Sequence, residues 1–465
     1  MNPFINPLFT IPFLKHYLFD SGRLHRSKHE QIIKSRNKLL KKILDYTYTV
    51  PVYKEKYEKN GINIKDIKST DDIPKLPFVS KKDFIDNFPK KIVPENYDFK
   101  KGFVVTTGGS SGKPVSVYTD FHTLSRGLCL AARQNRVYNY NLRKIRFASV
   151  GNHLPGRIDN IFENTVISQT KMFRKKGNYI AINAFEPMKD IINKLNEFKP
   201  DVIYTYPITL LHIAYFKRKG YCDNINPKIL QVSGYSLDQY TKKYVEDAFN
   251  CKVVNLYQSV EGGGDIAFEC LEGTWHVNYD MFYIETVDEK WDVVSGERGH
   301  IVLTRLFGRG TPFVRYTGLD DWVTIVDDYK CNCGLRTPIL KNGVEGRVSA
   351  RIILPDGRIF PAESFAIISL ILKDLNTFKI RQFQIIQKKI DEIEILVVVD
   401  NDLRDVEPSL DFIYKKIKDA YQEKCGPGVK INIKEVDEIK SPPGKPLPYV
   451  ISNVKIEDGF KILEW

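Results

Sequence analysis

The sequence predicts an α/β protein with a large N-terminal body and a small α+β C-terminal domain. Its 465 residues are too many for one compact core, so at least two units are expected. Short apolar runs alternate with helical stretches over most of the chain, which is typical of a sheet covered by helices. Past residue 347 this alternation gives way to a smaller set of strand-like and helical segments. We therefore expect a body over residues 1–347 and a mobile C-terminal domain over residues 348–465.

The individual elements follow from hydrophobic spacing. Residues 1–60 should form a helical N-terminal region, because apolar residues recur at helical spacing between 29 and 57. Apolar runs predict strands of the body at 102–105, 145–150, 202–206, 229–232 and 253–257. Runs at 299–304 and 322–326 follow glycine turns and indicate antiparallel strands, so a β-rich subdomain is expected at about 265–347. In the C-terminal domain we expect strands around 385–386, 393–399 and 429–433, and a helix at 410–420.

Composition and charge limit the classes of partner. The formal net charge of +13 is compatible with nucleic acid, with an anionic membrane surface, or with a polyanionic substrate such as ATP or coenzyme A. The lysines are spread along the chain and no basic cluster alternates with aromatic residues, so we expect no nucleic-acid partner. Seven cysteines, an odd number, argue against a disulfide framework and favour a reducing, cytoplasmic location.

The N-terminal segment is apolar but carries Pro3, Pro7 and Pro12, so we expect neither a signal peptide nor a membrane-spanning helix there. Packing against the body and peripheral association with a membrane surface both stay open. Either a monomer or a homodimer is compatible with the sequence.

A loop rich in glycine and hydroxyl groups separates two apolar runs within residues 103–118. It consists of Thr107, Gly108, Gly109, Ser110, Ser111, Gly112 and Lys113. Glycines let backbone N–H groups face an anion, hydroxyls add donors, and the lysine adds positive charge, so the loop should bind a polyphosphate. It is not a Walker loop, because Thr107 replaces a required glycine and Pro114 replaces the magnesium-binding Ser or Thr.

The sequence Thr-Gly-Gly-Ser-Ser-Gly-Lys-Pro at 107–114 resembles the loop of adenylate-forming enzymes, in particular the phenylacetate-coenzyme A ligase family and its capsule-biosynthesis relatives. Residues 39–53, 73–77 and 80–84 resemble the N-terminal region of that family, and the resemblance covers almost the whole chain. It implies an acyl-CoA synthetase-like body. It also implies ATP-dependent adenylation of a small-molecule carboxylic acid to acyl-AMP, with release of pyrophosphate.

The second half of the implied reaction leaves several acceptors open. Coenzyme A is the acceptor most typical of the family, while an amine such as an amino sugar would fit a role in surface-polysaccharide biosynthesis. An amino acid or a carrier thiol could also be the acceptor. An acyl-protein synthetase, similar to the one in the fatty-acid pathway of bioluminescence, is a further possibility within this enzyme class. The alternative from another class is a catalytically degenerate nucleotide-binding or scaffold protein, because Tyr235, Val260 and Ser349 depart from the family pattern.

Residues 232–237 and 253–261 resemble the family's adenine and magnesium segments. The resemblance implies that Tyr257 stacks on adenine and that Glu261 binds Mg²⁺. The remaining implied ATP-binding residues of these segments are Ser233, Gly234, Tyr235, Gln258 and Ser259.

Three positions nearer the C-terminus complete the implied site. The run 313–322 resembles the family's Arg-Tyr…Asp motif, which assigns the ribose hydroxyls to Asp320, with Asp321 as the neighbouring alternative. Arg347 lies in a Gly-Arg hinge motif whose arginine approaches the nucleotide. Lys445 aligns with a C-terminal lysine that bridges the substrate carboxylate and the α-phosphate. The implied catalytic residues are therefore Lys445, Glu261 and Arg347.

Two further groups of residues complete the candidates. His153, Tyr206 and Pro207 could line the pocket for the acid, although core packing would explain them equally well. Cys270, His276, Cys331 and Cys333 offer three thiolates and an imidazole, which suit a tetrahedral Zn²⁺. We expect this zinc to be structural, because four protein ligands leave no position for water. Four unrelated buried residues are the rival interpretation.

Overall fold

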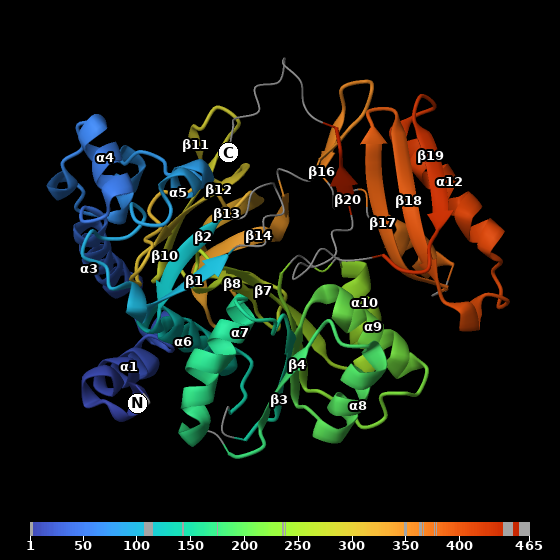
Figure 1. Ribbon diagram of the computed structural model, residues 1–465, viewed down its shortest axis with the longest axis horizontal. Helices are drawn as coiled ribbons and strands as arrows, with labels where there is room; N and C mark the ends of the chain where they lie inside the picture. Colours follow the sequence, from blue (N-terminus) through green and yellow to red (C-terminus); the bar gives the residue numbers. More distant parts are fainter. Residues whose placement is uncertain are drawn as a thin grey trace.

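The computed structural model describes residues 3–106, 115–141, 144–173, 175–234, 237, 239–347, 351–361, 365, 367–375, 377, 379–439 and 450–454. A body built on a long mixed sheet and a smaller C-terminal unit with its own sheet lie side by side (Figure 1). The predicted α/β class is therefore confirmed.

A mixed sheet runs through the whole body. Its parallel half contains β3 (Phe147–Gly151), β4 (Tyr179–Asn183), β5 (Val202–Thr205), β6 (Ile229–Val232) and β7 (Lys252–Ser259). Its antiparallel half contains β8 (Gly264–Glu269), β9 (Trp275–Val277), β10 (Phe282–Val287), β11 (Val293–Val294), β12 (Arg298–Arg305), β13 (Asp321–Lys330) and β14 (Arg336–Arg347). Among the described residues these form one 12-stranded sheet in the order β11-β10-β12-β13-β14-β9-β8-β7-β6-β5-β3-β4. The two halves join at β7, which runs parallel to β6 and antiparallel to β8.

Helices cover both faces of the parallel half (Figure 1). On one face α8 (Met188–Phe198), α9 (Pro207–Arg218) and α10 (Gln239–Phe249) pack on the strands through an aliphatic core. On the other face α6 (Phe121–Val137) packs against the sheet through Leu130. Because both faces are buried, β5 and β6 read as nearly continuous apolar runs in the sequence.

The N-terminal region is helical, as predicted, but its pattern over 29–57 belongs to two helices. These are α3 (His29–Thr47) and α4 (Pro51–Lys59). Pro51 has no N–H group to continue α3, whereas the first turn of a helix accepts proline, so a new helix begins there. Three further helices belong to this side of the body: α1 (Pro7–Phe19), α2 (Arg23–Arg26) and α5 (Lys81–Asn87).

The C-terminal unit is a four-stranded sheet with helices packed on it. Its described elements are β15 (Arg351–Ile353), β16 (Ile359–Pro361), α11 (Ile368–Asp374), β17 (Ile380–Lys389), β18 (Glu392–Val399), α12 (Leu410–Cys425), β19 (Lys430–Glu435) and β20 (Val450–Ser452). The described sheet has the order β19-β18-β17-β20. Ile413 and Ile417 of α12 pack on Ile385 and Ile395, which gives this unit its own core.

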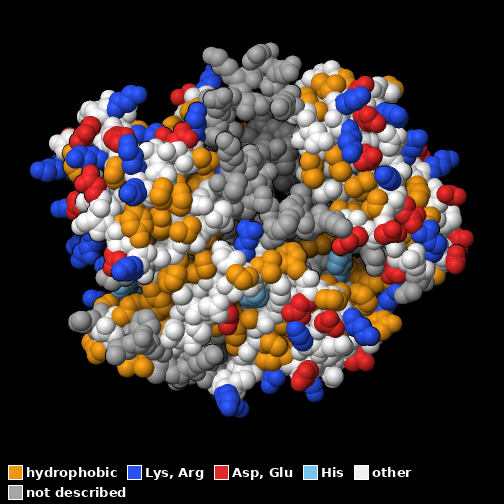
Figure 2. Space-filling view, viewed as in Figure 1, with side chains coloured by type: hydrophobic (Ala, Val, Ile, Leu, Met, Phe, Trp, Pro, Cys, Tyr) orange, Lys and Arg blue, Asp and Glu red, His pale blue; other side chains and the backbone are white. Residues whose placement is uncertain are grey.

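The surface agrees with the charge pattern of the sequence. In Figure 2, basic and acidic side chains are interspersed over the visible face and do not form a single basic field. No helix in the described part of the chain is long and apolar enough to cross a membrane.

Candidate active site and metal centre

Several predicted site residues gather at the carboxyl ends of the parallel strands. His153 follows β3, Tyr206 follows β5, Ser233 follows β6, and Tyr257 lies near the end of β7. In an open α/β sheet, ligands bind in the crevice outside this edge. The sheet topology therefore brings residues that are 104 positions apart in the chain, from 153 to 257, to one edge.

Tyr206 connects two parts of this edge. A Cβ atom on Gly234 would lie 3.2 Å from the Tyr206 ring, and Gly234 has a φ of +98°, so the close approach of this loop requires glycine. The Tyr206 hydroxyl donates to Oδ2 of Asp159 at 2.9 Å and accepts from the Asn152 N–H at 3.1 Å. Burial and the nearby Asp159 raise the pKa of Tyr206, so the phenol stays protonated at neutral pH.

His153 lies beside the same carboxylate. Nε2 of His153 and Oδ2 of Asp159 both approach the position that a Cβ on Gly151 would occupy, at 3.6 and 2.8 Å. Both ring nitrogens of His153 are buried and have no hydrogen-bond partner among the described residues. A buried imidazole without partners is unusual and suits a group that contacts a ligand. Pro207, by contrast, is the first residue of α9 and starts that helix.

A chain of hydrogen bonds connects Ser233 to a buried carboxylate. Nε2 of Gln258 donates to Asp265, and Oε1 of Gln258 accepts from the Tyr204 hydroxyl at 2.7 Å. The Tyr204 oxygen lies 2.6 Å from Oγ of Ser233. Burial raises the pKa of Asp265 to about 6, so at pH 7 it is mostly ionised and only accepts.

The direction of this chain determines what Ser233 can offer. Because Tyr204 donates its one proton to Gln258, Ser233 must donate its own proton to Tyr204. Ser233 therefore has only lone pairs left for a ligand. Such an oxygen accepts a hydrogen bond from an amino group and does not pair with a carbonyl.

Tyr257, Asp320, Asp321 and Arg347 lie close together, although β7 is not paired with β13 or β14. The Tyr257 hydroxyl donates to Oδ2 of Asp321 at 2.7 Å, and both residues are buried. Asp320 immediately precedes β13 and has a φ of +61°. Arg347 is the backbone partner of Asp321 in the β13 and β14 pairing. The predicted ribose, adenine and hinge positions are thus neighbours in space.

Glu261 lies in a tight turn after β7. Ser259 Oγ accepts from the Gly262 N–H at 2.8 Å, and desolvation raises the pKa of the buried Glu261 carboxyl although the Ser259 hydroxyl also donates to it. A buried carboxylate with a raised pKa favours a nearby cation, and oxygen ligands suit Mg²⁺. The residue set at this turn therefore fits a divalent cation.

Arg305 ties the Glu261 turn to a neighbouring hairpin. This fully buried guanidinium donates to the Glu261 carbonyl and to the Thr311 carbonyl, each at 2.9 Å. Thr311 in turn accepts from the Tyr118 N–H of β2 through its hydroxyl at 3.1 Å. β1 (Gly102–Thr106) and β2 (Ser116–Asp120) are an antiparallel pair, so the segment with the predicted phosphate loop connects two paired strands beside Glu261.

Some predicted residues lie outside the described residues. They are the loop residues 107–113, Tyr235 and Lys445, and for Arg347 only the backbone is described.

The four predicted zinc ligands converge. The ligand atoms of Cys270, His276, Cys331 and Cys333 all lie within 4.8 Å of one another. Sγ of Cys270 is 3.8 Å from Sγ of Cys331, and Sγ of Cys333 is 3.2 Å from Nε2 of His276. Two thiolates bound at about 2.3 Å to a tetrahedral ion are about 3.8 Å apart, so the first of these distances already suits Zn²⁺.

Two matching turns present the thiols. The Cys270 N–H donates to the Thr274 carbonyl at 2.9 Å, and the Cys331 N–H donates to the Leu335 carbonyl at 2.9 Å. Each turn closes with a left-handed glycine, Gly273 or Gly334, three residues after its first cysteine. Oγ1 of Thr337 lies 2.8 Å from Nδ1 of His276, which directs Nε2 toward the thiols. The residues present therefore fit a closed, four-ligand metal site.

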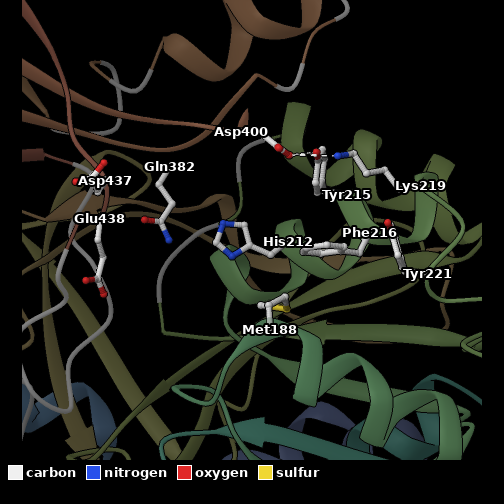
Figure 3. A pocket seen from close by; sticks show the side chains of 10 residues that line it. All are labelled: Met188, His212, Tyr215, Phe216, Lys219, Tyr221, Gln382, Asp400, Asp437 and Glu438. Atoms are coloured by element: carbon white, nitrogen blue, oxygen red, sulfur yellow. Dashed lines mark hydrogen bonds and ion pairs between the residues drawn. The ribbon is translucent and has the colours of Figure 1, made fainter. Parts of the chain in front are cut away.

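A pocket separates the body from the C-terminal unit. It has a volume of about 320 Å³ (Figure 3). On the body side it is lined mainly by α9, and on the other side by Gln382 of β17, Asp400 after β18, and Asp437 and Glu438 after β19. The Tyr215 hydroxyl donates to Oδ2 of Asp400, and Nζ of Lys219 lies 3.3 Å from the same oxygen. These contacts join the two units, and the pocket contains none of the predicted site residues.

Comparison with known proteins supports the resemblance inferred from the motifs. Residues 364–453 match the CapK C-terminal domain family. The chain is 24% identical over 456 residues to Protein CapK of Staphylococcus aureus, covering 95% of this chain and 94% of that protein. It is 24% identical over 384 residues to the phenylacetate-coenzyme A ligase of Thermus thermophilus, covering 77% of this chain and 80% of the ligase.

The solved structures agree in fold. The crystal structure of 2-hydroxyisobutyryl-CoA ligase in the postadenylation state, in complex with R3-HIB-AMP, superposes with a TM-score of 0.74 at 18% identity. The superposition covers 93% of this chain and 91% of that one. The chain is thus a relative of Protein CapK and of the phenylacetate-coenzyme A ligases, and it has the fold of the adenylate-forming CoA ligases.

Proposed function

We propose that this protein adenylates a carboxylic acid. A carboxylate oxygen attacks the α-phosphorus of ATP, the bond from that phosphorus to the bridging oxygen of the β-phosphate breaks, and pyrophosphate leaves. The products are acyl-AMP and pyrophosphate. The observation that carries the proposal is the convergence of Tyr206, Gly234 and Tyr257 at the carboxyl edge of the sheet, with the Glu261 turn linked through Arg305 and Thr311 to the β1 and β2 pair.

The nucleoside would be held by the residues around β6, β7 and β13. The Ser233 oxygen can only accept, which suits the exocyclic amino group of adenine. Tyr257, fixed by its hydrogen bond to Asp321, would stack on the base, and Asp320 would accept from the ribose hydroxyls.

The triphosphate would bind on residues 107–113, and Glu261 would hold Mg²⁺. The bound Mg²⁺ would screen the charge of the phosphates. Lys445 and Arg347 would offset the negative charge that develops at the α-phosphorus, as a fixed cation does in a site shielded from water. His153 and Tyr206 would face the carboxylic acid, because they follow β3 and β5 and both lie beside Asp159.

The C-terminal unit would supply Lys445 by closing over this edge. The contacts of Asp400 with Tyr215 and Lys219 support an arrangement in which α9 holds the C-terminal unit against the body. Placing the lysine on a separate unit would restrict its help to the closed state.

The acyl group would then pass to an acceptor. A thiol of coenzyme A or an amine attacks the acyl carbonyl, and AMP leaves with its phosphate oxygen. The match to Protein CapK over nearly the full length of both chains supports testing amines, amino sugars among them, beside coenzyme A.

We also propose that Cys270, His276, Cys331 and Cys333 bind a structural Zn²⁺. Four ligands would fill the tetrahedron and leave no water to activate. The ion would tie the turn after β8 to the turn between β13 and β14.

Carboxylate-dependent exchange of labelled pyrophosphate into ATP tests the adenylation proposal. A panel of carboxylic acids should give exchange with at least one member, and Glu261→Gln or Lys445→Ala should abolish it. Glu423→Gln and Lys418→Ala, which change exposed residues of α12, should leave it unchanged. Nucleotide binding without exchange for any acid would contradict the proposal and favour a scaffold protein.

A further inference from the structure

The helix α1 is apolar on two faces, and the described part of the chain covers one of them. Phe9 and Phe13 are buried with Phe4 against Leu124 and Leu128 of α6. A helix that is apolar all round is normally buried on all sides. The outer face of α1 therefore needs an explanation that packing among the described residues does not supply.

The outer face carries a continuous exposed stripe. Ile11, Leu14 and Leu18 follow one another at the i, i+3, i+7 spacing of one helix face, and Ile11 and Leu18 are 67% and 54% exposed. Ile5 precedes the helix and Phe19 ends it, each 62% exposed. Such a grouping marks an interaction surface, in contrast to isolated exposed apolar residues.

The exposed charged side chains among residues 3–28 are all basic. Lys15, Arg26 and Lys28 are exposed. The side chain of Arg26, which belongs to α2, reaches the C-terminal end of α1 and donates to the Leu18 carbonyl at 2.8 Å. The only acidic residue among residues 3–28 is Asp20, which is buried and paired with Arg23. The segment that carries the stripe therefore presents exposed apolar and basic side chains and, within residues 3–28, no exposed acid.

We propose that the outer face of α1 binds the surface of a membrane that contains anionic lipids. The apolar stripe would enter the boundary between headgroups and acyl chains, while Lys15 and Arg26 contact the anionic headgroups. A helix of 13 residues is about 20 Å long, too short to cross a hydrocarbon core of about 30 Å, so it would lie in the interface.

A second copy of the chain is a poorer occupant. In a two-fold dimer built on this stripe, the same patch faces itself, so Lys15 and Arg26 would approach their own counterparts. Anionic lipid complements these charges, whereas a second copy repeats them.

Sedimentation of the full-length protein with vesicles tests the proposal without any measurement of catalysis. The protein should bind vesicles of equal parts phosphatidylglycerol and phosphatidylcholine, bind much less to pure phosphatidylcholine, and dissociate as salt is raised. The triple variant Ile11→Ser, Leu14→Ser, Leu18→Ser should lower the partition coefficient by about tenfold or more. Lys15→Gln and Arg26→Gln should each lower it by about fivefold.

The matched control is Val293→Ser with Val406→Ser, because both valines are about half exposed, 48% and 54%, and lie far from α1 in the sequence. The control should bind vesicles as the parent does. Equal binding by the triple variant and the parent would overturn the proposal, as would absence of binding to the anionic vesicles. Concentration-dependent dimerisation that the triple variant abolishes would assign the stripe to a second copy. If the triple variant does not fold, the two single charge variants decide.

Discussion

Loss of the metal at the Cys270, His276, Cys331 and Cys333 cluster should destabilise the body measurably. The ion would join two turns that are 61 positions apart in the chain, from Cys270 to Cys331. A ligand present at 1,000 times its Kd stabilises the native state by about 4 kcal/mol. One kcal/mol shifts the Tm of a large domain by about 2 °C, so removal of zinc should lower the Tm of the body by roughly 8 °C.

The assay combines metal analysis with thermal unfolding. The purified protein should contain one zinc per chain, and a chelator that removes it should lower the Tm. Cys331→Ser should lose the zinc and melt at the temperature of the stripped protein, whereas Cys251→Ser, outside the cluster, should keep the metal. A parent protein that carries no zinc and melts at the same temperature with and without the chelator would refute the reasoning.

Three further predictions concern the nucleotide edge and the contact between the two units. Glu261→Gln should stabilise the nucleotide-free protein at pH 7 by on the order of 1 kcal/mol, seen as a higher Tm, while it abolishes pyrophosphate exchange. Burial raises the pKa of Glu261, so the contribution of Glu261 to stability is present at acid pH and is lost as pH rises through the folded-state pKa. The gain in Tm of the Gln variant should therefore disappear at low pH. An equal gain in Tm at all pH values would contradict this. Tyr204→Phe removes the hydroxyl that connects Gln258 to Ser233. The Kd for ATP, measured by calorimetry, should therefore rise by about tenfold. An unchanged Kd would mean that the hydrogen-bond chain does not position Ser233. Asp400→Asn removes the ion pair with Lys219 and weakens the hydrogen bond from Tyr215, together worth about 1 kcal/mol. Distance measurements between spin labels on the two units should therefore show about fivefold less of the arrangement in which α9 contacts the C-terminal unit. Identical distance distributions for variant and parent would contradict the role of Asp400.

The fold could be predicted wherever burial alone decides an element. The strand Ile229–Val232 was predicted with its observed bounds, because a strand covered on both faces is an uninterrupted apolar run. The continuity of the sheet across β7 and β8 could not be predicted, since pairing partners are set by tertiary contacts. The sequence predicted a helical region over residues 1–60 but not the bounds of α1: Pro7 and Pro12 argue against a helix locally, whereas the packing of Phe9 and Phe13 against α6 stabilises it.

The candidate site divides in the same way. Residues with a characteristic type and spacing, such as the Cys and His cluster, could be proposed from the sequence, and the structure brings those four together. Asp159 and Arg305 could not, because neither lies in a recognisable motif. Their importance comes from burial and from hydrogen bonds to Tyr206 and to the Glu261 carbonyl, which depend on the folded chain.

Adenylation itself can be followed by the fate of a single oxygen atom. An accepted carboxylic acid labelled with ¹⁸O in both carboxylate oxygens should be incubated with the protein, ATP, Mg²⁺ and the acceptor, and the nucleotide product examined by mass spectrometry. If the carboxylate attacks the α-phosphorus and the acceptor then attacks the carbonyl, AMP should carry one ¹⁸O atom. Unlabelled AMP, or ADP with inorganic phosphate in its place, would contradict the proposed reaction.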